Sequence, residues 1–165
     1  MQTCAFLRTL FSKGLRGPFL VLAPLSCTPH WQREFESWVP EMSVVSYAGT
    51  SDSRDMASTY EFSWTKALGD SITGEQEKAI KSLPRKTIRA NVVISSYDTM
   101  RSDLAFFKSI EWQVLVVDEA HQIKNEQTKL YQSIAQCKFD HKVFLTGTPI
   151  QVRSRQTRAS LSGLL

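Results

Sequence analysis

Long apolar runs are absent from this sequence, and with them the usual means of crossing a membrane. No stretch of the 165 residues approaches the roughly 20 apolar residues that a membrane-spanning helix needs. The segment from Met1 to Phe11 also lacks the charged start, apolar middle and small-residue cleavage site of a signal peptide. We therefore expect no membrane partner.

Cysteine is scarce as well. Cys4, Cys27 and Cys137 are odd in number, lie far apart and show no paired metal-ligand spacing. This pattern argues against a disulfide framework and against a cysteine-ligated metal site. We expect three reduced, mostly buried thiols in an intracellular compartment.

Internal repeats and low-complexity segments are also lacking, and the composition is that of one globular domain. Apolar residues make up 42% and charged residues 22% of the chain. The net charge of +4 permits contact with an anionic polymer without requiring it. Charges of both signs alternate through residues 50–90, which we interpret as a charged insertion with a short helix between Thr73 and Pro84.

Apolar strands alternate with amphipathic helices along the rest of the chain. Strands are predicted at residues 19–23, 43–47, 92–95, 113–117 and 142–146. Helices are predicted at residues 1–12, from 28 up to 40, from 98 to about 108, and at 125–136, with Asp98 as a cap of the third. This alternation predicts a three-layer α/β domain with a mostly parallel sheet.

Local chemistry specifies the start and the inner face of the second helix. Thr28 precedes Pro29, so we expect Thr28 to be the N-cap, with proline at the first helical position. Trp31, Phe35 and Trp38 follow at i, i+4 and i+7. This spacing predicts an aromatic face that packs inward and does not stack on bases.

The predicted strand at residues 113–117 ends in acidic residues. The apolar run finishes at Val117, and Asp118, Glu119 and then His121 follow. Ligands of parallel sheets bind just beyond the carboxyl ends of the strands. One carboxylate there can bind Mg²⁺, while its neighbour orients or deprotonates a water molecule. The alternative interpretation is a strand followed by an acidic helix cap.

Three other predicted strand ends carry polar or turn-forming residues. They are Ala23-Pro24-Leu25-Ser26, Ser95-Ser96-Tyr97 and Leu145-Thr146-Gly147-Thr148-Pro149. A doubly wound sheet places the carboxyl ends of its parallel strands along one edge. We therefore expect these segments and the acid pair to form one site.

These segments resemble the motifs of a known family. The DEAH-box motif II of Snf-family DNA translocases is matched by Asp118-Glu119-Ala120-His121 with Ile123-Lys124-Asn125, and motif III by Leu145-Thr146-Gly147-Thr148-Pro149-Ile150-Gln151. A closer resemblance, to chromodomain-helicase-DNA-binding remodellers of the Mi-2 type, rests on Gly17-Pro18-Phe19-Leu20, Trp31-Gln32-Arg33-Glu34-Phe35, Trp38-Val39-Pro40 and Tyr60-Glu61-Phe62. The resemblance spans about residues 2–151 and implies the first RecA-like lobe, of P-loop NTPase type, incomplete at both ends.

The resemblance implies a role for each matching residue. Asp118 would bind Mg²⁺ at the ATP phosphates, and Glu119 would activate the hydrolytic water. Coupling of the nucleotide state to the DNA-facing side would fall to His121, Thr146, Gly147 and Thr148. DNA phosphates would be met at Ser26, Cys27, Thr28, Ser95 and Ser96, where N–H groups at a helix start favour anions. The alternative for both sets is local capping and turn formation.

Two departures from the family pattern bear on activity. The phosphate-binding loop Gly-x-Gly-Lys-Thr is missing, and Gln2-Thr3 resemble the residues that follow it. Residues 152–165 form an atypical basic tail. We therefore expect residues 1–151 to be a partial ATP-binding lobe, from a fragment or from a truncated or misjoined gene model. Such a chain is expected not to hydrolyse ATP alone.

The resemblance implies an ATP-dependent chromatin remodeller that acts in the nucleus. It would hydrolyse ATP with Mg²⁺, translocate on the double-stranded DNA of nucleosomes and need a second RecA-like lobe. The alternative is a non-catalytic nucleic-acid or protein interaction module. The missing phosphate loop favours this alternative for the isolated chain, whereas Asp118 and Glu119 favour the enzyme for its parent.

Overall fold

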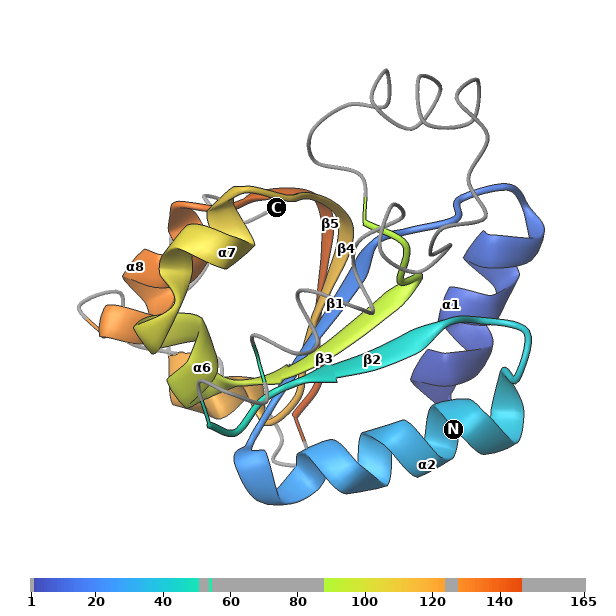
Figure 1. Ribbon diagram of the computed structural model, residues 1–165, viewed down its shortest axis with the longest axis horizontal. Helices are drawn as coiled ribbons and strands as arrows, with labels where there is room; N and C mark the ends of the chain where they lie inside the picture. Colours follow the sequence, from blue (N-terminus) through green and yellow to red (C-terminus); the bar gives the residue numbers. More distant parts are fainter. Residues whose placement is uncertain (1, 51–53, 55–87, 124–127, 147–165) are drawn as a thin grey trace, which may run out of the picture.

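A five-stranded sheet lies at the centre of the computed structural model, which describes residues 2–50, 54, 88–123 and 128–146 (Figure 1). The strands are β1 (Phe19–Ala23), β2 (Val44–Tyr47), β3 (Val92–Ser96), β4 (Glu111–Val117) and β5 (Lys138–Phe144). Their order is β2-β3-β1-β4-β5, and every neighbouring pair is parallel. The predicted parallel α/β sheet is confirmed. The helix predicted between Thr73 and Pro84 lies outside the described residues.

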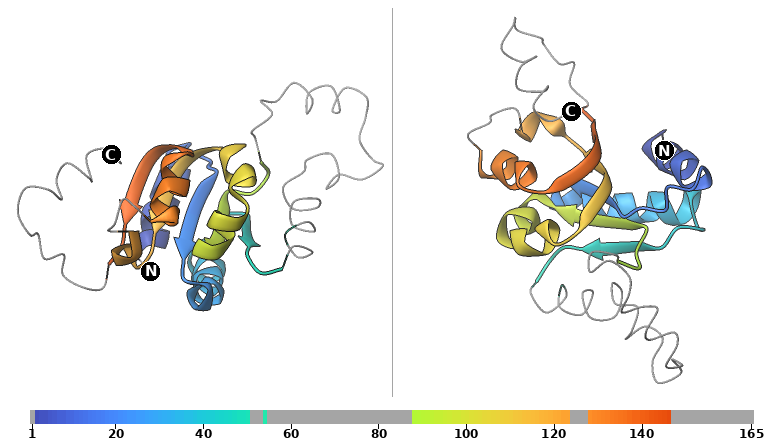
Figure 2. Two further views of the ribbon diagram at one scale, coloured as in Figure 1. Left: turned by 90° about the vertical axis from the view of Figure 1, so that its left-hand side faces the viewer. Right: turned by 90° about the horizontal axis from the view of Figure 1, so that it is seen from above.

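Helices cover both faces of the sheet. They are α1 (Gln2–Ser12), α2 (Thr28–Trp38), α6 (Tyr97–Ser102), α7 (Leu104–Lys108) and α8 (Lys129–Ala135). Figure 2 shows α1 and α2 on one face and the other three on the opposite face. The three predicted layers are therefore present. No helix in the described ranges is long and apolar enough to cross a membrane.

Alternation along the strands divides the core into two clusters. Phe19 and Val21 of β1 pack with α1 and α2, whereas Leu20 and Leu22 pack with residues of α6, α7 and α8. All five β1 residues are buried. Each fully buried large apolar side chain contributes about 1.5–3 kcal/mol, so the central strand is held from both sides.

The connections leave the centre of the sheet in opposite directions. After β1 the chain forms a 3₁₀ turn, η1 (Leu25–Cys27), and then α2 on one face. After β3 it enters α6, and after β4 it passes through a second 3₁₀ turn, η4 (Ala120–Ile123), to α8 on the other face. Ligands of doubly wound sheets bind where neighbouring connections part in this way. The topology therefore places the candidate site at the ends of β1, β3 and β4.

Two predicted helix caps are wrong. α2 begins at Thr28 itself, whose hydroxyl donates back to the Leu25 carbonyl at 2.9 Å. The 3₁₀ turn before it already brings the chain into a helical conformation, so Thr28 does not act as the N-cap. The N-cap of α6 is Ser96 and not Asp98, since the Ser96 side chain accepts from the Thr99 N–H at 3.1 Å.

The helix predicted from residue 98 to 108 is two helices. The break is at Asp103, which has φ −126° and ψ 49° and therefore leaves the helical region. Its carboxylate accepts a 2.5 Å hydrogen bond from the Tyr47 hydroxyl of β2. The break in the helix thus coincides with a hydrogen bond to a residue of a distant strand. The local spacing of apolar residues does not reveal this hydrogen bond.

β5 begins four residues earlier than the predicted strand at residues 142–146. Its first half is polar, because Lys138, Asp140 and His141 are exposed. Edge strands commonly carry such charges, which hinder pairing with other chains. No apolar run therefore marks the start of this strand. α8 begins at Lys129, and residues 125–127 of the predicted helix lie outside the described part.

The aromatic face of α2 is only partly as predicted. Trp31 and Phe35 are buried, whereas Trp38 is 46% exposed. Trp38 is the last residue of α2. The thiols fit their prediction more closely: all three are free, Cys4 and Cys137 are buried, and Cys27 is half-buried.

Candidate functional site

Asp118 is the first residue after β4, and its main chain still belongs to the sheet. Its N–H donates to the Leu22 carbonyl of β1 at 2.8 Å. Oδ1 accepts from the Glu119 N–H and Oδ2 from the Trp31 indole N–H, each at 2.9 Å. The carboxylate therefore has a defined direction, and within the described part of the chain each oxygen keeps a second lone pair for another ligand.

A tight turn follows, and the segment after β5 supports it. Glu119 has φ +49°, in the left-handed region that few residues other than glycine adopt. Its Oε2 lies 3.0 Å from Nδ1 of His121. The Ala120 N–H donates to the Leu145 carbonyl, and the Leu145 N–H donates to Val117, both at 2.8 Å. The acidic turn is thus joined to the end of β5.

The four predicted coupling residues are only partly described. His121 contacts Glu119, and Thr146 directly follows Leu145, so it lies beside the acidic turn. Gly147 and Thr148 lie outside the described residues. The segments predicted to meet at one edge of the sheet therefore do so for the residues that can be placed.

Trp31 is a residue of the site that its spacing did not identify. The aromatic periodicity of α2 predicts a core side chain, and Trp31 is indeed only 8% exposed. Its indole N–H nevertheless donates to Asp118, across from α2 to the end of β4. A buried indole N–H needs a hydrogen-bond partner, but the sequence pattern does not say which one.

Tyr97 approaches the same residue from the opposite layer. It is the first residue of α6, it is 5% exposed, and its hydroxyl donates to the Asp118 carbonyl oxygen. Burial raises the pKa of Tyr97 above its ordinary value of 10.0, and the negative charges of Asp118 and Glu119 raise it further. The phenol therefore remains a protonated donor at neutral pH.

The loop after β1 presents one exposed hydroxyl. Ser26 is exposed in η1, and its Oγ lies 3.9 Å from the half-buried Cys27 Sγ. Thr28 is 5% exposed, and its hydroxyl is already engaged with Leu25. Of the three residues predicted to contact nucleic acid here, Ser26 is the one whose side chain faces solvent.

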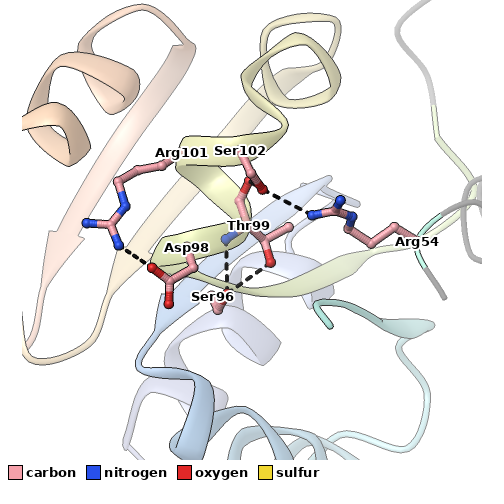
Figure 3. Close-up of polar contacts among 6 residues, drawn as sticks. All are labelled: Arg54, Ser96, Asp98, Thr99, Arg101 and Ser102. Carbon is pink, nitrogen blue, oxygen red and sulfur yellow. Dashed lines mark hydrogen bonds and ion pairs between the residues drawn. The ribbon is translucent and has the colours of Figure 1, made fainter. Parts of the chain in front are cut away.

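The two serines after β3 lie inside the fold. The Ser95 hydroxyl donates to the Tyr47 carbonyl at 2.5 Å, and Ser95 is fully buried. Ser96 is 2% exposed, and its Oγ contacts both the N–H and the hydroxyl of Thr99, at 3.1 and 2.9 Å (Figure 3). These hydroxyls hold the loop and cap α6, while the expected contact of Ser95 and Ser96 with DNA, through N–H groups at a helix start, stays a prediction.

Two arginines form polar contacts with residues of α6. Arg101 forms an ion pair with Asp98, and Arg54 donates to the Ser102 hydroxyl at 3.1 Å. Figure 3 shows the two guanidinium groups on opposite sides of the helix. A cavity of about 240 Å³ opens nearby, lined by Pro24, Leu25, Tyr97, Asp98, Arg101, Thr128 and Leu130.

The donor set at Asp118 fits Mg²⁺. Within the described ranges no three His, Cys, Asp or Glu side chains form a cluster that could hold a metal by themselves. Mg²⁺ is usually bound through one or two carboxylates, with water and substrate phosphates completing its octahedron. Asp118, with free lone pairs on both carboxylate oxygens, meets this requirement, whereas a site made entirely of protein ligands is not present in this part of the chain.

Comparison with known proteins identifies the family to which this parallel sheet and its acidic turn belong. The chain belongs to the SNF2-related domain family, whose model matches residues 1–164. It is 37% identical over 151 residues to the CHD3-type chromatin-remodeling factor PICKLE of Arabidopsis thaliana, covering 92% of this chain and 11% of that protein. It is also 39% identical over 152 residues to the chromodomain-helicase-DNA-binding protein 3 homolog of Caenorhabditis elegans, covering 92% of this chain and 8% of that protein.

Chromodomain-helicase-DNA-binding protein 6 of Rattus norvegicus is 37% identical over 151 residues, covering 92% of this chain and 5% of that protein. The chain thus spans between 5% and 11% of these three relatives. The predicted resemblance to chromodomain-helicase-DNA-binding remodellers is confirmed.

Solved structures agree on the fold. The Sulfolobus solfataricus SWI2/SNF2 ATPase core in complex with dsDNA matches with a TM-score of 0.65 at 24% identity, covering 92% of this chain and 26% of that one. The Sulfolobus solfataricus SWI2/SNF2 ATPase core domain matches with a TM-score of 0.60 at 23% identity, covering 90% of this chain and 24% of that one. This likeness establishes the fold, and the predicted RecA-like architecture is confirmed.

Proposed function

We propose that this chain is part of the first RecA-like lobe of an ATP-dependent chromatin remodeller. The observation that carries the proposal is the acid pair at the carboxyl edge of the sheet, with both oxygens of Asp118 oriented by hydrogen bonds and Glu119 beside it. Membership of the SNF2-related family and similarity to chromodomain-helicase-DNA-binding proteins support it. The site of action would be chromatin in the nucleus.

The two acids divide the work of hydrolysis. Asp118 would hold Mg²⁺, which when bound neutralises charge on the ATP phosphates. Glu119 would orient the attacking water and take its proton. His121, 3.0 Å from Glu119 Oε2, would restrict the direction of that carboxylate and, with Thr146 to Thr148, relay the nucleotide state to the DNA-facing loops.

Double-stranded DNA is the proposed polymer partner. Ser26 to Thr28 would meet a phosphate where η1 leads into α2, because N–H groups at a helix start attract anions. Ser95 and Ser96 would hold the neighbouring loop through their buried hydroxyls. One of the Sulfolobus solfataricus SWI2/SNF2 cores that share this fold is in complex with dsDNA, which supports this choice of partner.

Hydrolysis by the parent enzyme would need two parts that these 165 residues do not supply. The sequence contains no Gly-x-Gly-Lys-Thr segment, which in P-loop enzymes cradles the phosphates. A second RecA-like lobe would contribute arginines that stabilise charge in the transition state.

The DNA proposal is tested by a titration of labelled duplex DNA followed by fluorescence anisotropy. We expect weak binding without sequence preference and a shallow salt dependence, since each neutralised phosphate contributes a log–log slope of about −0.9. Ser26→Glu should weaken binding, because it adds a negative charge at the proposed phosphate contact. Ser12→Glu, at an exposed serine of α1, adds the same charge elsewhere and is the matched control.

Equal affinities for the two variants would contradict a phosphate contact at Ser26. Tight binding that barely responds to salt, or a clear sequence preference, would contradict the proposed mode of DNA binding.

A further inference from the structure

Asp118 is held by two aromatic side chains from opposite layers of the domain. Trp31 belongs to α2 and donates its indole N–H to Oδ2 at 2.9 Å. Tyr97 belongs to α6, on the other face of the sheet, and donates its hydroxyl to the main-chain carbonyl of Asp118. The indole N–H thus fixes the direction of the carboxylate, and the tyrosine hydroxyl fixes the main chain from which the carboxylate projects.

Packing of the core does not by itself require the indole N–H of Trp31 or the hydroxyl of Tyr97. Phenylalanine would fill most of the same apolar space at both positions without a polar group to satisfy. A buried N–H or O–H is costly unless it is bonded, so each ring places its polar end where one acceptor is available. Both acceptors belong to the same residue, and the remaining carboxylate oxygen is held by the Glu119 N–H.

We propose that Trp31 and Tyr97 are positioning residues for Asp118, and that they keep its carboxylate in the direction needed to bind a divalent cation. The inference rests on the proposed role of Asp118 in the function above. A carboxylate with one oxygen released could rotate about its side-chain bonds, and cation binding would then carry the entropic cost of ordering it. Outer partners of metal-binding carboxylates typically change metal affinity by about 10- to 100-fold when they are removed.

The hydrogen bond itself is tested by NMR on the full 165-residue chain. The sequence has four tryptophans, so four indole N–H signals are expected, and loss of one in Trp31→Phe identifies the signal of Trp31. Asp118→Asn should displace this signal further than Glu119→Gln does, because only Asp118 accepts from the indole. Equal or smaller displacement in Asp118→Asn would overturn the proposal.

The role of Tyr97 is tested with the same signals. Tyr97→Phe keeps the ring and removes the donor to the Asp118 carbonyl, so the Glu119 amide and the Trp31 indole signals should both move. Tyr131→Phe removes a hydroxyl from α8 and should leave both in place. If the two variants behave alike, Tyr97 serves packing only and its part of the proposal fails.

Metal affinity is measured with Mn²⁺ alone, from the broadening of the Asp118 and Glu119 amide signals. Trp31→Phe should weaken Mn²⁺ binding by about 10-fold or more. Trp38→Phe is the matched control, since Trp38 lies on the same helix but is 46% exposed, and it should leave the affinity unchanged. Unchanged affinity in Trp31→Phe would overturn positioning toward the cation.

Failure of the proposed function gives a different result. If Mn²⁺ does not broaden these signals in the unsubstituted chain, Asp118 does not bind the cation. The inference that Trp31 and Tyr97 orient Asp118 toward a cation is then wrong as well. The indole and amide displacements then still decide whether the two aromatic side chains orient Asp118.

Discussion

Gly17, just before β1, illustrates how a single residue is determined by its surroundings. It has φ +90°, and a Cβ at this position would lie 2.5 Å from the Asn91 carbonyl oxygen. Its N–H donates to the Gln113 side chain at 2.8 Å, which joins the segment before β1 to β4. Only glycine combines this backbone conformation with so close an approach.

We expect Gly17→Ala to destabilise the domain by more than Gly14→Ala. Both glycines have positive φ, but nothing lies within 4 Å of a Cβ at Gly14, where φ is +98°. Gly14→Ala should therefore show the conformational cost alone, about 1–3 kcal/mol, and Gly17→Ala should add a steric cost to it. Urea unfolding measures both, and equal losses would show that Asn91 moves aside freely.

Cys137 should make stability depend on pH in the alkaline range. Burial raises the pKa of its thiol from an ordinary value of 9.0 to about 11 in the folded chain. Below pH 9 both states keep the proton, so the contribution of this thiol to stability is fully present. Between pH 9 and pH 11 the unfolded chain loses the proton first, and stability should fall as pH rises.

The measurement is thermal or urea unfolding from about pH 8 to about pH 11, which spans both pKa values of the thiol. Cys137→Ala should flatten part of the decline. Equal slopes for Cys137→Ala and the unsubstituted chain would exclude this thiol as the cause.

At the scale of elements, substitution of Ser96 distinguishes a role in capping α6 from a contact with DNA. Its side chain accepts from the Thr99 N–H and contacts the Thr99 hydroxyl in a buried setting. Ser96→Ala should lower the free energy of unfolding by about 1–3 kcal/mol, through loss of the cap and an unsatisfied partner. Ser12→Ala, at an exposed position of α1, should change it by no more than about 0.5 kcal/mol.

Ser96→Ala also tests whether the Ser96 hydroxyl contacts nucleic acid. Because the Ser96 hydroxyl faces inward, the folded fraction of Ser96→Ala should bind duplex DNA as the unsubstituted chain does. A selective loss of DNA affinity, beyond the loss of folded protein, would show that this hydroxyl contacts the polymer.

Element boundaries were predicted best where burial is continuous. β1 is buried at all five positions, and its predicted and observed ranges agree at residues 19–23. β5 is an edge strand with exposed charges in its first half, so its start carries no apolar run. The helix break at Asp103 coincides with a hydrogen bond to Tyr47, 56 residues away in sequence, which local periodicity cannot anticipate.

At the scale of the whole molecule, the 165-residue chain should release no measurable phosphate from Mg²⁺–ATP, with or without DNA. Phosphoryl transfer depends mainly on positioning and charge neutralisation, and the sequence holds neither a Gly-x-Gly-Lys-Thr segment nor a second lobe. An arginine finger alone can contribute about 10³–10⁵ in rate in GTPases.

The assay compares the unsubstituted chain with Glu119→Gln, which keeps the shape of the side chain and removes the base. DNA-stimulated turnover that disappears in Glu119→Gln would show that the acid pair works without those parts. Turnover equal in both would point to a contaminating ATPase.

Sequence alone determined the class of the domain and the identity of its acidic motif. Continuous apolar runs impose burial on both faces, and their alternation with helices leaves a parallel α/β sheet as the arrangement that buries them. The position of Asp118 and Glu119 at a carboxyl edge follows from that topology. The tertiary structure alone decided how Asp118 is held, because its Trp31 and Tyr97 donors lie 87 and 21 residues away in sequence. Hydrogen bonds of this kind depend on how two helices pack on opposite faces of the sheet, which no local pattern of residues encodes.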